Sequence, residues 1–280
     1  MEQPIYITPE EAALLRRNRR RSVGAGFMYF GMYVVVNALV STVYAIALVA
    51  VTLIQTGELD YMTLMQRVLD GAALLAGICG ILTLVVYWIF FAARRCRFGE
   101  ETRLRRVNVP ALLLMIPLGL CCYVFVVCIL SLLPQATLSS YTDSAAGLLG
   151  ASSVLTILCI AVIAPLSEEV IFRGLLYTRL KRGMGRAPAI LLASLLFGIM
   201  HGQLIWAAYA CALSVLLCLV LDWYDSLWAS VLLHLSFNAG QYLLPAFLEP
   251  LSLPVLLIGS VLLLVPLILL AHRVGKRARR

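Results

Sequence analysis

Residues 148–180 read LLGASSVLTILCIAVIAPLSEEVIFRGLLYTRL, and this stretch decides what kind of fold the chain can adopt. Its first twenty residues contain no charged side chain, and about 20 apolar residues are the length that a helix needs to cross a bilayer. The same run then contains Glu168, Glu169 and Arg173. Ionisable groups are costly inside a membrane, so they usually mark a cavity or a functional centre. The stretch therefore predicts a transmembrane helix that carries part of a functional site.

The whole chain is as apolar as this stretch. Of its 280 residues 62% are hydrophobic and 13% are charged, whereas soluble domains carry about 25% charged residues. This balance excludes a water-soluble globular enzyme, a disordered regulator and a disulfide-stapled secreted module. The expected fold class is all-α, a polytopic transmembrane helical bundle of about eight spans, because each span takes about 20 residues. We place these spans at Phe27–Ile54, Gly71–Ala93, Val109–Leu133, Leu148–Leu180, Ala187–Gly202, Gln203–Leu221, Leu227–Leu244 and Leu251–Ala271.

The spans divide the chain into four parts. These are an N-terminal cytoplasmic amphipathic segment (1–22), three N-terminal spans (23–147), a catalytic membrane core (148–245), and a last span with a basic cytoplasmic tail (246–280). Thr8, Pro9, Glu10 and Glu11 have the pattern of a helix N-terminus, so we expect a short amphipathic helix on the membrane before the first span. The Ser- and Thr-rich stretch 134–147 is expected to be an ordinary extracytoplasmic loop.

The basic residues lie on one side of the predicted spans. The net charge is +8, and 20 of the 22 Lys and Arg residues fall before the first span, in the loop 94–106, at 179–186 and in the last eight residues. Positive residues collect on the cytoplasmic side of membrane proteins. The sequence therefore predicts a multi-pass protein of the cell membrane with both termini in the cytoplasm. Its basic rim fits anionic lipid headgroups as a partner, and nucleic acid is the weaker explanation of the charge.

Seven of the eight cysteines lie inside predicted spans, and none forms a CxxC pair. They are therefore interpreted as small buried hydrophobic residues without a disulfide or zinc framework.

Polar side chains occur inside three of the predicted spans. Besides the acidic and basic residues of the fourth, the fifth contains His201, and the seventh contains His234 and Asn238. Glu168 lies sixteen residues before the turn near Met184, and His201 lies seventeen residues after it. At a rise of about 1.5 Å per residue both lie about 25 Å from this turn. We therefore expect these side chains to converge on one buried site.

Spacing within the helices predicts how the side chains pair. Glu169 and Arg173 are four residues apart, as are His234 and Asn238, so the members of each pair share a helix face. Glu168 points about 100° away from Glu169, so one carboxylate can be neutralised by Arg173 while its neighbour faces a cavity. Pro165 either kinks this span and frees backbone carbonyls toward the cavity or belongs to ordinary helix curvature.

This set of side chains suits hydrolysis. Glu168, as a buried carboxylate, can take a proton from water while the imidazole of His201 orients that water. His234 and Asn238 can donate hydrogen bonds to the oxyanion that forms when water attacks a carbonyl group.

A metal site is the alternative use of the same atoms. Glu168, His201 and His234 would leave an open position on zinc, as hydrolytic zinc sites do. The chain has no HExxH motif, and the three ligands would come from separate spans. The residues alone leave both possibilities open.

Three short motifs occur in this order between residues 148 and 244: EEVIFRG matches EExxxR, FGIMH matches FxxxH, and HLSFN matches HxxxN. Together they resemble the intramembrane proteases of the CAAX-protease and bacteriocin-processing family, whose members are described both as metalloproteases and as metal-free glutamate-dependent enzymes. The resemblance implies an endopeptidase but does not imply prenylated substrates, because family members also act on other peptides or confer bacteriocin immunity. We expect the substrate to be a membrane-associated peptide or a lipidated protein. The resemblance also implies Glu168 as the catalytic carboxylate, Glu169 and Arg173 as its supports, His201 as its partner on the water, and His234 and Asn238 as oxyanion donors.

A non-catalytic function would use the same polar cluster differently. The protein could be an immunity factor, a scaffold or a proton-coupled transporter, with Glu169 and Arg173 as a structural ion pair and the histidines as hydrogen-bond donors between helices. A transporter would more readily show two related halves with interrupted helices, and the chain shows no such repeat.

The charge pattern gives a first testable prediction about topology. Single cysteines placed in the N-terminal segment, at position 97 and near the C-terminus of a cysteine-free chain should react only with reagent supplied from the cytoplasm, because the basic clusters hold these segments there. A cysteine at position 140 should react only from outside. Labelling of position 140 from the cytoplasm would refute the eight-span arrangement.

Overall fold

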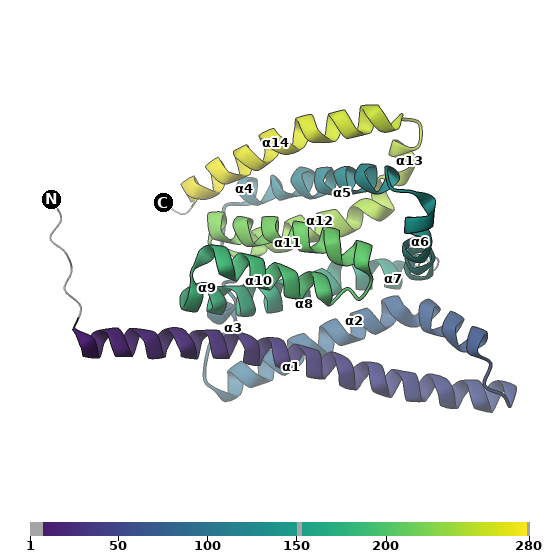
Figure 1. Cartoon of the computed structure of the whole chain (residues 1–280), viewed down its shortest axis with the longest axis horizontal. Helices are drawn as coiled ribbons and strands as arrows, with labels where there is room; N and C mark the ends of the chain where they lie inside the picture. The colour runs from purple at the N-terminus through teal and green to yellow at the C-terminus, as the bar shows by residue number, and fades with distance from the viewer. Residues whose placement is uncertain (1–7, 150–152, 279–280) are drawn as a thin grey trace.

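A computed structural model describes residues 8–149 and 153–278, and these residues form helices without a single strand (Figure 1). The fold class is therefore confirmed as an all-α bundle. In chain order the helical elements are α1 (Pro9–Thr56), α2 (Tyr61–Ala93), α3 (Phe98–Glu101), α4 (Val109–Leu113), α5 (Met115–Ser131), α6 (Gln135–Leu149), α7 (Val154–Leu158), η1 (Cys159–Ile163), α8 (Ala164–Glu168), η2 (Glu169–Tyr177), α9 (Thr178–Met184), α10 (Arg186–Ile199), α11 (Leu204–Tyr224), α12 (Leu227–Leu243), α13 (Pro245–Leu248) and α14 (Leu253–Ala278).

Six helical runs in the described residues are long and apolar enough to cross a membrane. They are α1, α2, α4 with α5, α7 through α9, α11 and α14. The expected fifth and seventh spans are present as shorter helices, α10 with 14 residues and α12 with 17. At 1.5 Å per residue α10 is about 21 Å long, which is less than the hydrocarbon thickness of about 30 Å. The expected eight full-length spans are thus six long helical runs and two shorter helices.

The first helix differs from the expected arrangement. Thr8 caps it as predicted, because its side chain accepts a hydrogen bond from the Glu11 backbone while the Glu11 carboxylate accepts one from the Thr8 backbone. However, the helix then continues for 48 residues without a break. The expected short amphipathic helix and the first span are therefore one helix, about 72 Å long.

The stretch 134–147 was expected to be a loop, and it is helical. Helix α6 covers Gln135–Leu149 and packs against α2. The Ser and Thr residues do not prevent this, because several of their hydroxyls bond back to carbonyls three residues earlier, as Thr142 does to Ser139.

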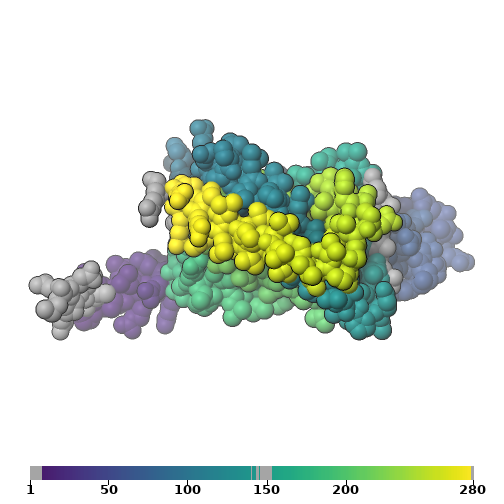
Figure 2. All heavy atoms as spheres, turned by 90° about the horizontal axis from the view of Figure 1, so that it is seen from above, coloured from purple at the N-terminus to yellow at the C-terminus, as the bar shows by residue number. Residues whose placement is uncertain are grey.

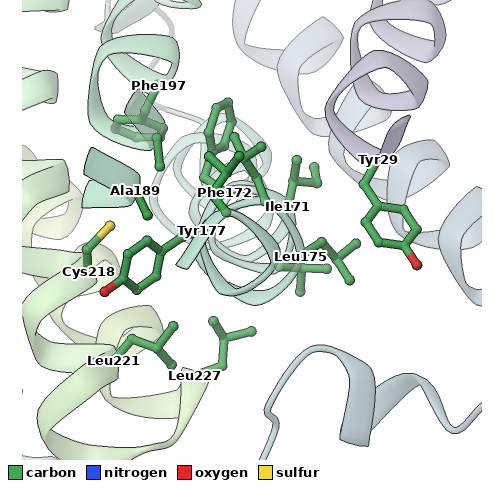
Figure 3. Close-up of a cluster of buried hydrophobic side chains, with 14 of the residues drawn as sticks. Tyr29, Ile171, Phe172, Leu175, Tyr177, Ala189, Phe197, Cys218, Leu221 and Leu227 are labelled. Carbon is green, nitrogen blue, oxygen red and sulfur yellow. The ribbon is translucent and has the colours of Figure 1, made fainter. Parts of the chain in front are cut away.

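Two apolar clusters hold the bundle together. The first surrounds the π-helical segment η2, whose nine residues are all buried, between Tyr29 of α1 and Cys218 and Leu221 of α11 (Figure 3). The second joins α5 and α12 to α11 and α14 through residues such as Met115 and Leu233. The segment that the sequence singled out therefore lies at the centre of the packing.

The outermost helices expose apolar side chains. Helix α14 forms a continuous band on the outside of the bundle (Figure 2), and only Ser260, Ala271 and Gly275 of its residues are buried. Exposed Leu, Val and Ile side chains cover its outer face. Such a surface is stable against lipid chains and unstable in water.

The basic loops meet at one end of the bundle, where the start of α1 and the end of α14 also lie (Figure 1). At this end the carboxylates of Glu101, Asp222 and Asp225 pair with basic side chains of these loops. Asp222 binds Lys181 at 2.6 Å and Arg186 at 2.9 Å, Asp225 pairs with Arg103 and Arg105, and Glu101 pairs with Arg179. The loops that the sequence assigned to one side of the membrane are thus bridged to one another by acidic side chains.

The contact between α5 and α12 gives a second prediction. A Cβ atom at Gly119 would meet the Leu233 carbonyl oxygen and lie 2.7 Å from Cβ of Ser236. Gly119→Ala should therefore lower the free energy of unfolding by about 1–3 kcal/mol, measured by thermal unfolding in detergent. Gly31→Ala is the matched control, since nothing lies within 4 Å of the added atom and alanine stabilises a helix interior by about 0.5–1 kcal/mol. Equal stability of the two variants would refute the close α5–α12 contact.

Candidate active site

A fully buried ion pair forms the base of the site. Glu169 Oε1 lies 3.0 Å from Arg173 Nη1, and both side chains are 0% exposed. The pair that the four-residue spacing predicts is present, inside the π-helical segment η2.

The Arg173 guanidinium also stacks on an aromatic ring. Its guanidinium carbon lies 4.2 Å from the centre of the Phe197 ring on α10, a distance at which a cation is attracted to the ring face. Among the described residues no group satisfies hydrogen-bond geometry with the Arg173 nitrogens or with Glu169 Oε2. The ion pair with Glu169 and the stacking on Phe197 therefore hold this guanidinium in place. The stacking also joins α10, which carries Phe197, to η2.

Glu169 also holds His234, which the sequence did not predict. Nδ1 of His234 lies 2.9 Å from Glu169 Oε1, and Nε2 lies 3.8 Å from Glu168 Oε2. An ionised carboxylate can only accept, so Nδ1 of the ring must donate to it. Nε2 is then a hydrogen-bond acceptor when the ring is neutral, and it donates a hydrogen bond only when the ring is an imidazolium.

The two neighbouring carboxylates face different surroundings, as the 100° rotation between them predicts. The Glu169 side chain is sealed in the core, whereas the Glu168 side chain is 21% exposed and lines the largest cavity at the site. Arg173 therefore compensates Glu169, and Glu168 remains available to a ligand.

His201 lies outside the helix in which it was expected. Helix α10 ends at Ile199, and His201 occupies the turn before α11, where Gly202 has a φ of 71°. The ring stays in place because Nδ1 lies 2.9 Å from the Phe197 carbonyl oxygen. A carbonyl only accepts, so Nδ1 donates and Nε2 of the neutral ring is an acceptor. The turn still brings His201 to the same cavity as Glu168.

Asn238 is anchored by a helix irregularity next to Pro165. In the π-helical segment η1 the Ala164 N–H bonds to the Cys159 carbonyl five residues earlier. In that register the next donor, for the carbonyl of Ile160, would be residue 165, which as proline has no N–H. Asn238 Nδ2 donates to the Ile160 oxygen at 3.0 Å instead. The backbone carbonyl that Pro165 was expected to free is thus that of Ile160. It accepts a hydrogen bond from one N–H of the Asn238 amide.

One cavity of about 290 Å³ brings these groups together. Glu168, His201, His234 and Asn238 all line it. Apart from the amide of Gln241, the rest of its lining is apolar or aromatic and comes mainly from α5, α6, α11 and α12, including Tyr123, Tyr141, Trp206, Tyr209 and Phe237.

Sequence reasoning missed the aromatic side of this cavity. Trp206 lines the cavity and packs edge-on to Tyr141, with ring centres 5.8 Å apart. Tyr141 lies on α6, which was not expected to be helical. Isolated aromatic residues in apolar helices carry no motif, so no local signal could assign them to the site.

The candidate zinc ligands Glu168, His201 and His234 all line the cavity. Within residues 8–149 and 153–278, no three His, Cys, Asp or Glu side chains come together in a way that could hold a metal ion. Nδ1 of each histidine is held, His234 by Glu169 and His201 by a backbone carbonyl, an arrangement that leaves Nε2 of both rings open, as in many metal-binding histidines.

One comparison with known proteins finds a similarity in this part of the chain. Residues 150–240 match the family model described as Type II CAAX prenyl endopeptidase Rce1-like. The matched region contains all six candidate site residues. No curated protein and no solved structure matches the chain significantly.

The buried pair gives a third prediction. Glu169→Ala and Arg173→Ala each leave a buried charge without its partner, which costs about 3–5 kcal/mol, so both should reduce folded yield and the midpoint of thermal unfolding in detergent. Glu168→Gln should have a much smaller effect, because Glu168 faces the cavity. If Glu168→Gln is the least stable of the three, the two carboxylates have been assigned the wrong functions.

Proposed function

We propose, from the match of residues 150–240 to the model described as Type II CAAX prenyl endopeptidase Rce1-like, that this membrane protein hydrolyses a peptide bond inside its cavity. The observation that supports this most strongly is the convergence of Glu168, His201, His234 and Asn238 on one cavity, although they come from three separate segments of the bundle: α8, the turn before α11, and α12.

Glu168 is the general base in this proposal. It takes one proton from a water molecule whose oxygen bonds to the peptide carbonyl carbon. His201 Nε2 accepts a hydrogen bond from the second O–H of that water and orients it. The C–N bond of the tetrahedral intermediate then breaks, and Glu168 returns its proton to the leaving amine. All atoms and charges balance without a further reactant.

His234 and Asn238 stabilise the oxyanion in this proposal. The amide of Asn238 has a second N–H besides the one that binds Ile160. His234 Nε2 donates only as an imidazolium, and the Glu169 carboxylate 2.9 Å from Nδ1 would stabilise that charged form. Glu169 thus supports His234 directly. This function is additional to the ion pair with Arg173 that the sequence spacing predicted.

The cavity lining indicates the substrate. Apart from Glu168 and the two histidines, none of the described lining residues is charged in its usual state, so an uncharged stretch of a membrane-associated peptide or lipidated protein fits the cavity better than a soluble ionic compound. The basic clusters would face the cytoplasm of the cell and contact anionic headgroups.

A peptide-library cleavage assay on the purified protein tests the proposal. Wild-type protein should cleave an apolar peptide, and Glu168→Gln should abolish cleavage without loss of folding. Asn238→Ala should lower kcat by about 10²- to 10³-fold with little change in KM, because an oxyanion donor acts in the transition state.

A parallel sample with a strong chelator tests the zinc alternative. Residues Glu168, His201 and His234 would hold the metal, and zinc would activate the attacking water. We expect activity to survive chelation. Loss of activity with the chelator and its recovery with zinc would contradict the metal-free mechanism, and stoichiometric zinc that disappears in His234→Ala would identify a ligand. Binding of peptides without cleavage by any sample would favour a non-catalytic immunity, scaffold or transport function.

A further inference from the structure

A second, smaller cavity lies beside Glu168 and His201. Its volume is about 60 Å³, and Tyr33, Phe172 and Met200 line it together with Glu168, Phe197 and His201. The last three residues also line the large cavity. Glu168 and His201 therefore stand between two cavities of very different size.

The small cavity has room for water and for little else. A water molecule takes about 30 Å³ in the liquid, so this space holds about two of them. A peptide cannot enter it, whereas the large cavity is of the size of small-ligand sites, about 300 Å³ or more. A buried water also needs two to four polar partners. Here the Glu168 carboxylate, the His201 imidazole and the Tyr33 hydroxyl can supply them.

Tyr33 comes from α1, outside the region that the family model matches. Its ring packs edge-on to Phe172 of η2, with centres 5.6 Å apart at 78°, and contacts Phe30 on its own helix. Tyr33 and Glu168 line the same small cavity. Among the described residues no group hydrogen-bonds to the Tyr33 hydroxyl, so it is able to bind a water molecule.

We propose that the small cavity holds the hydrolytic water and that Tyr33 positions this water against Glu168. The proposal rests on the proposed peptidase function and extends it, because it separates the two reactants: the peptide occupies the large cavity, and water reaches Glu168 from the side of α1. The Tyr33 hydroxyl hydrogen-bonds to the water oxygen, Glu168 removes one proton, and the oxygen bonds to the carbonyl carbon as described above. Tyr33 itself gains and loses no proton.

Tyr33→Phe tests this, with Tyr29→Phe as the matched control. Both variants remove one phenol hydroxyl from α1, but Tyr29 lies one turn away and lines neither cavity. The assay uses the apolar peptide found in the library screen, with wild type and Glu168→Gln in parallel. Loss of one hydrogen bond to the reacting water should lower kcat by about 10- to 30-fold, with KM and thermal midpoint unchanged. The solvent deuterium isotope effect on kcat should rise, since water activation becomes slower. Tyr29→Phe should match wild type in all four quantities.

Three results would overturn the proposal: wild-type kcat in Tyr33→Phe, an equal loss in Tyr29→Phe, or a loss explained by a higher KM or a lower thermal midpoint alone. If Glu168→Gln is inactive while Tyr33→Phe is fully active, only the water site is wrong. If Glu168→Gln remains active, or no peptide is cleaved by wild type, the peptidase proposal fails and the water site fails with it.

Discussion

The oxygen Oε1 of Glu169 is the point on which the rest of this structure depends. It lies 3.0 Å from the Arg173 guanidinium and 2.9 Å from the His234 ring, and it does so in a core from which water is excluded. Burying each of these charges costs several kcal/mol, which is recovered only when the partners are held close. The position of η2 relative to α12 is therefore fixed by His234, and its position relative to α10 is fixed by the Phe197 ring over Arg173.

This anchoring determines what Glu168 can do. Glu168 is the next residue along the helix, so it must point away from the direction in which Glu169 is held. With Glu169 sealed against Arg173 and His234, the Glu168 carboxylate faces both cavities. The irregular backbone near Glu168 also shapes the site. The π-helical register near Pro165 leaves the Ile160 carbonyl without a backbone donor, and this carbonyl orients Asn238. A regular α-helix through this segment would not offer that carbonyl.

The sequence predicted the parts of this arrangement that depend on spacing along one helix. The Glu169–Arg173 pair, the division between the two carboxylates and the all-α membrane fold followed from periodicity and composition. The contact between Glu169 and His234 could not be predicted, because 65 residues separate the two and only packing decides which carboxylate the ring meets. The end of α10 was missed because apolar residues continue through the turn in FGIMHGQLIW, and Gly202 gives the only local sign of a break. Tyr33 was missed for a third reason: it is one of 12 tyrosines, and nothing near it in the chain indicates that α1 packs beside Glu168.

The formal charges of the site suit chemistry in a medium of low dielectric constant. With both carboxylates ionised, His201 neutral and His234 present as the imidazolium that can donate to the oxyanion, Glu168, Glu169, Arg173 and His234 give the cluster a formal charge of zero. The proposed attack of water leaves this charge unchanged, because the proton that leaves water neutralises Glu168 and the negative charge moves to the oxyanion. Creating a new charge in such a medium would cost far more than moving an existing one over a few ångströms. The groups that receive the moved charge are already oriented, Asn238 by the Ile160 carbonyl and His234 by Glu169, so little reorganisation is needed when the oxyanion forms. The Glu169–Arg173 pair therefore contributes by staying fixed: it cancels one of two adjacent negative charges and leaves the other free to move.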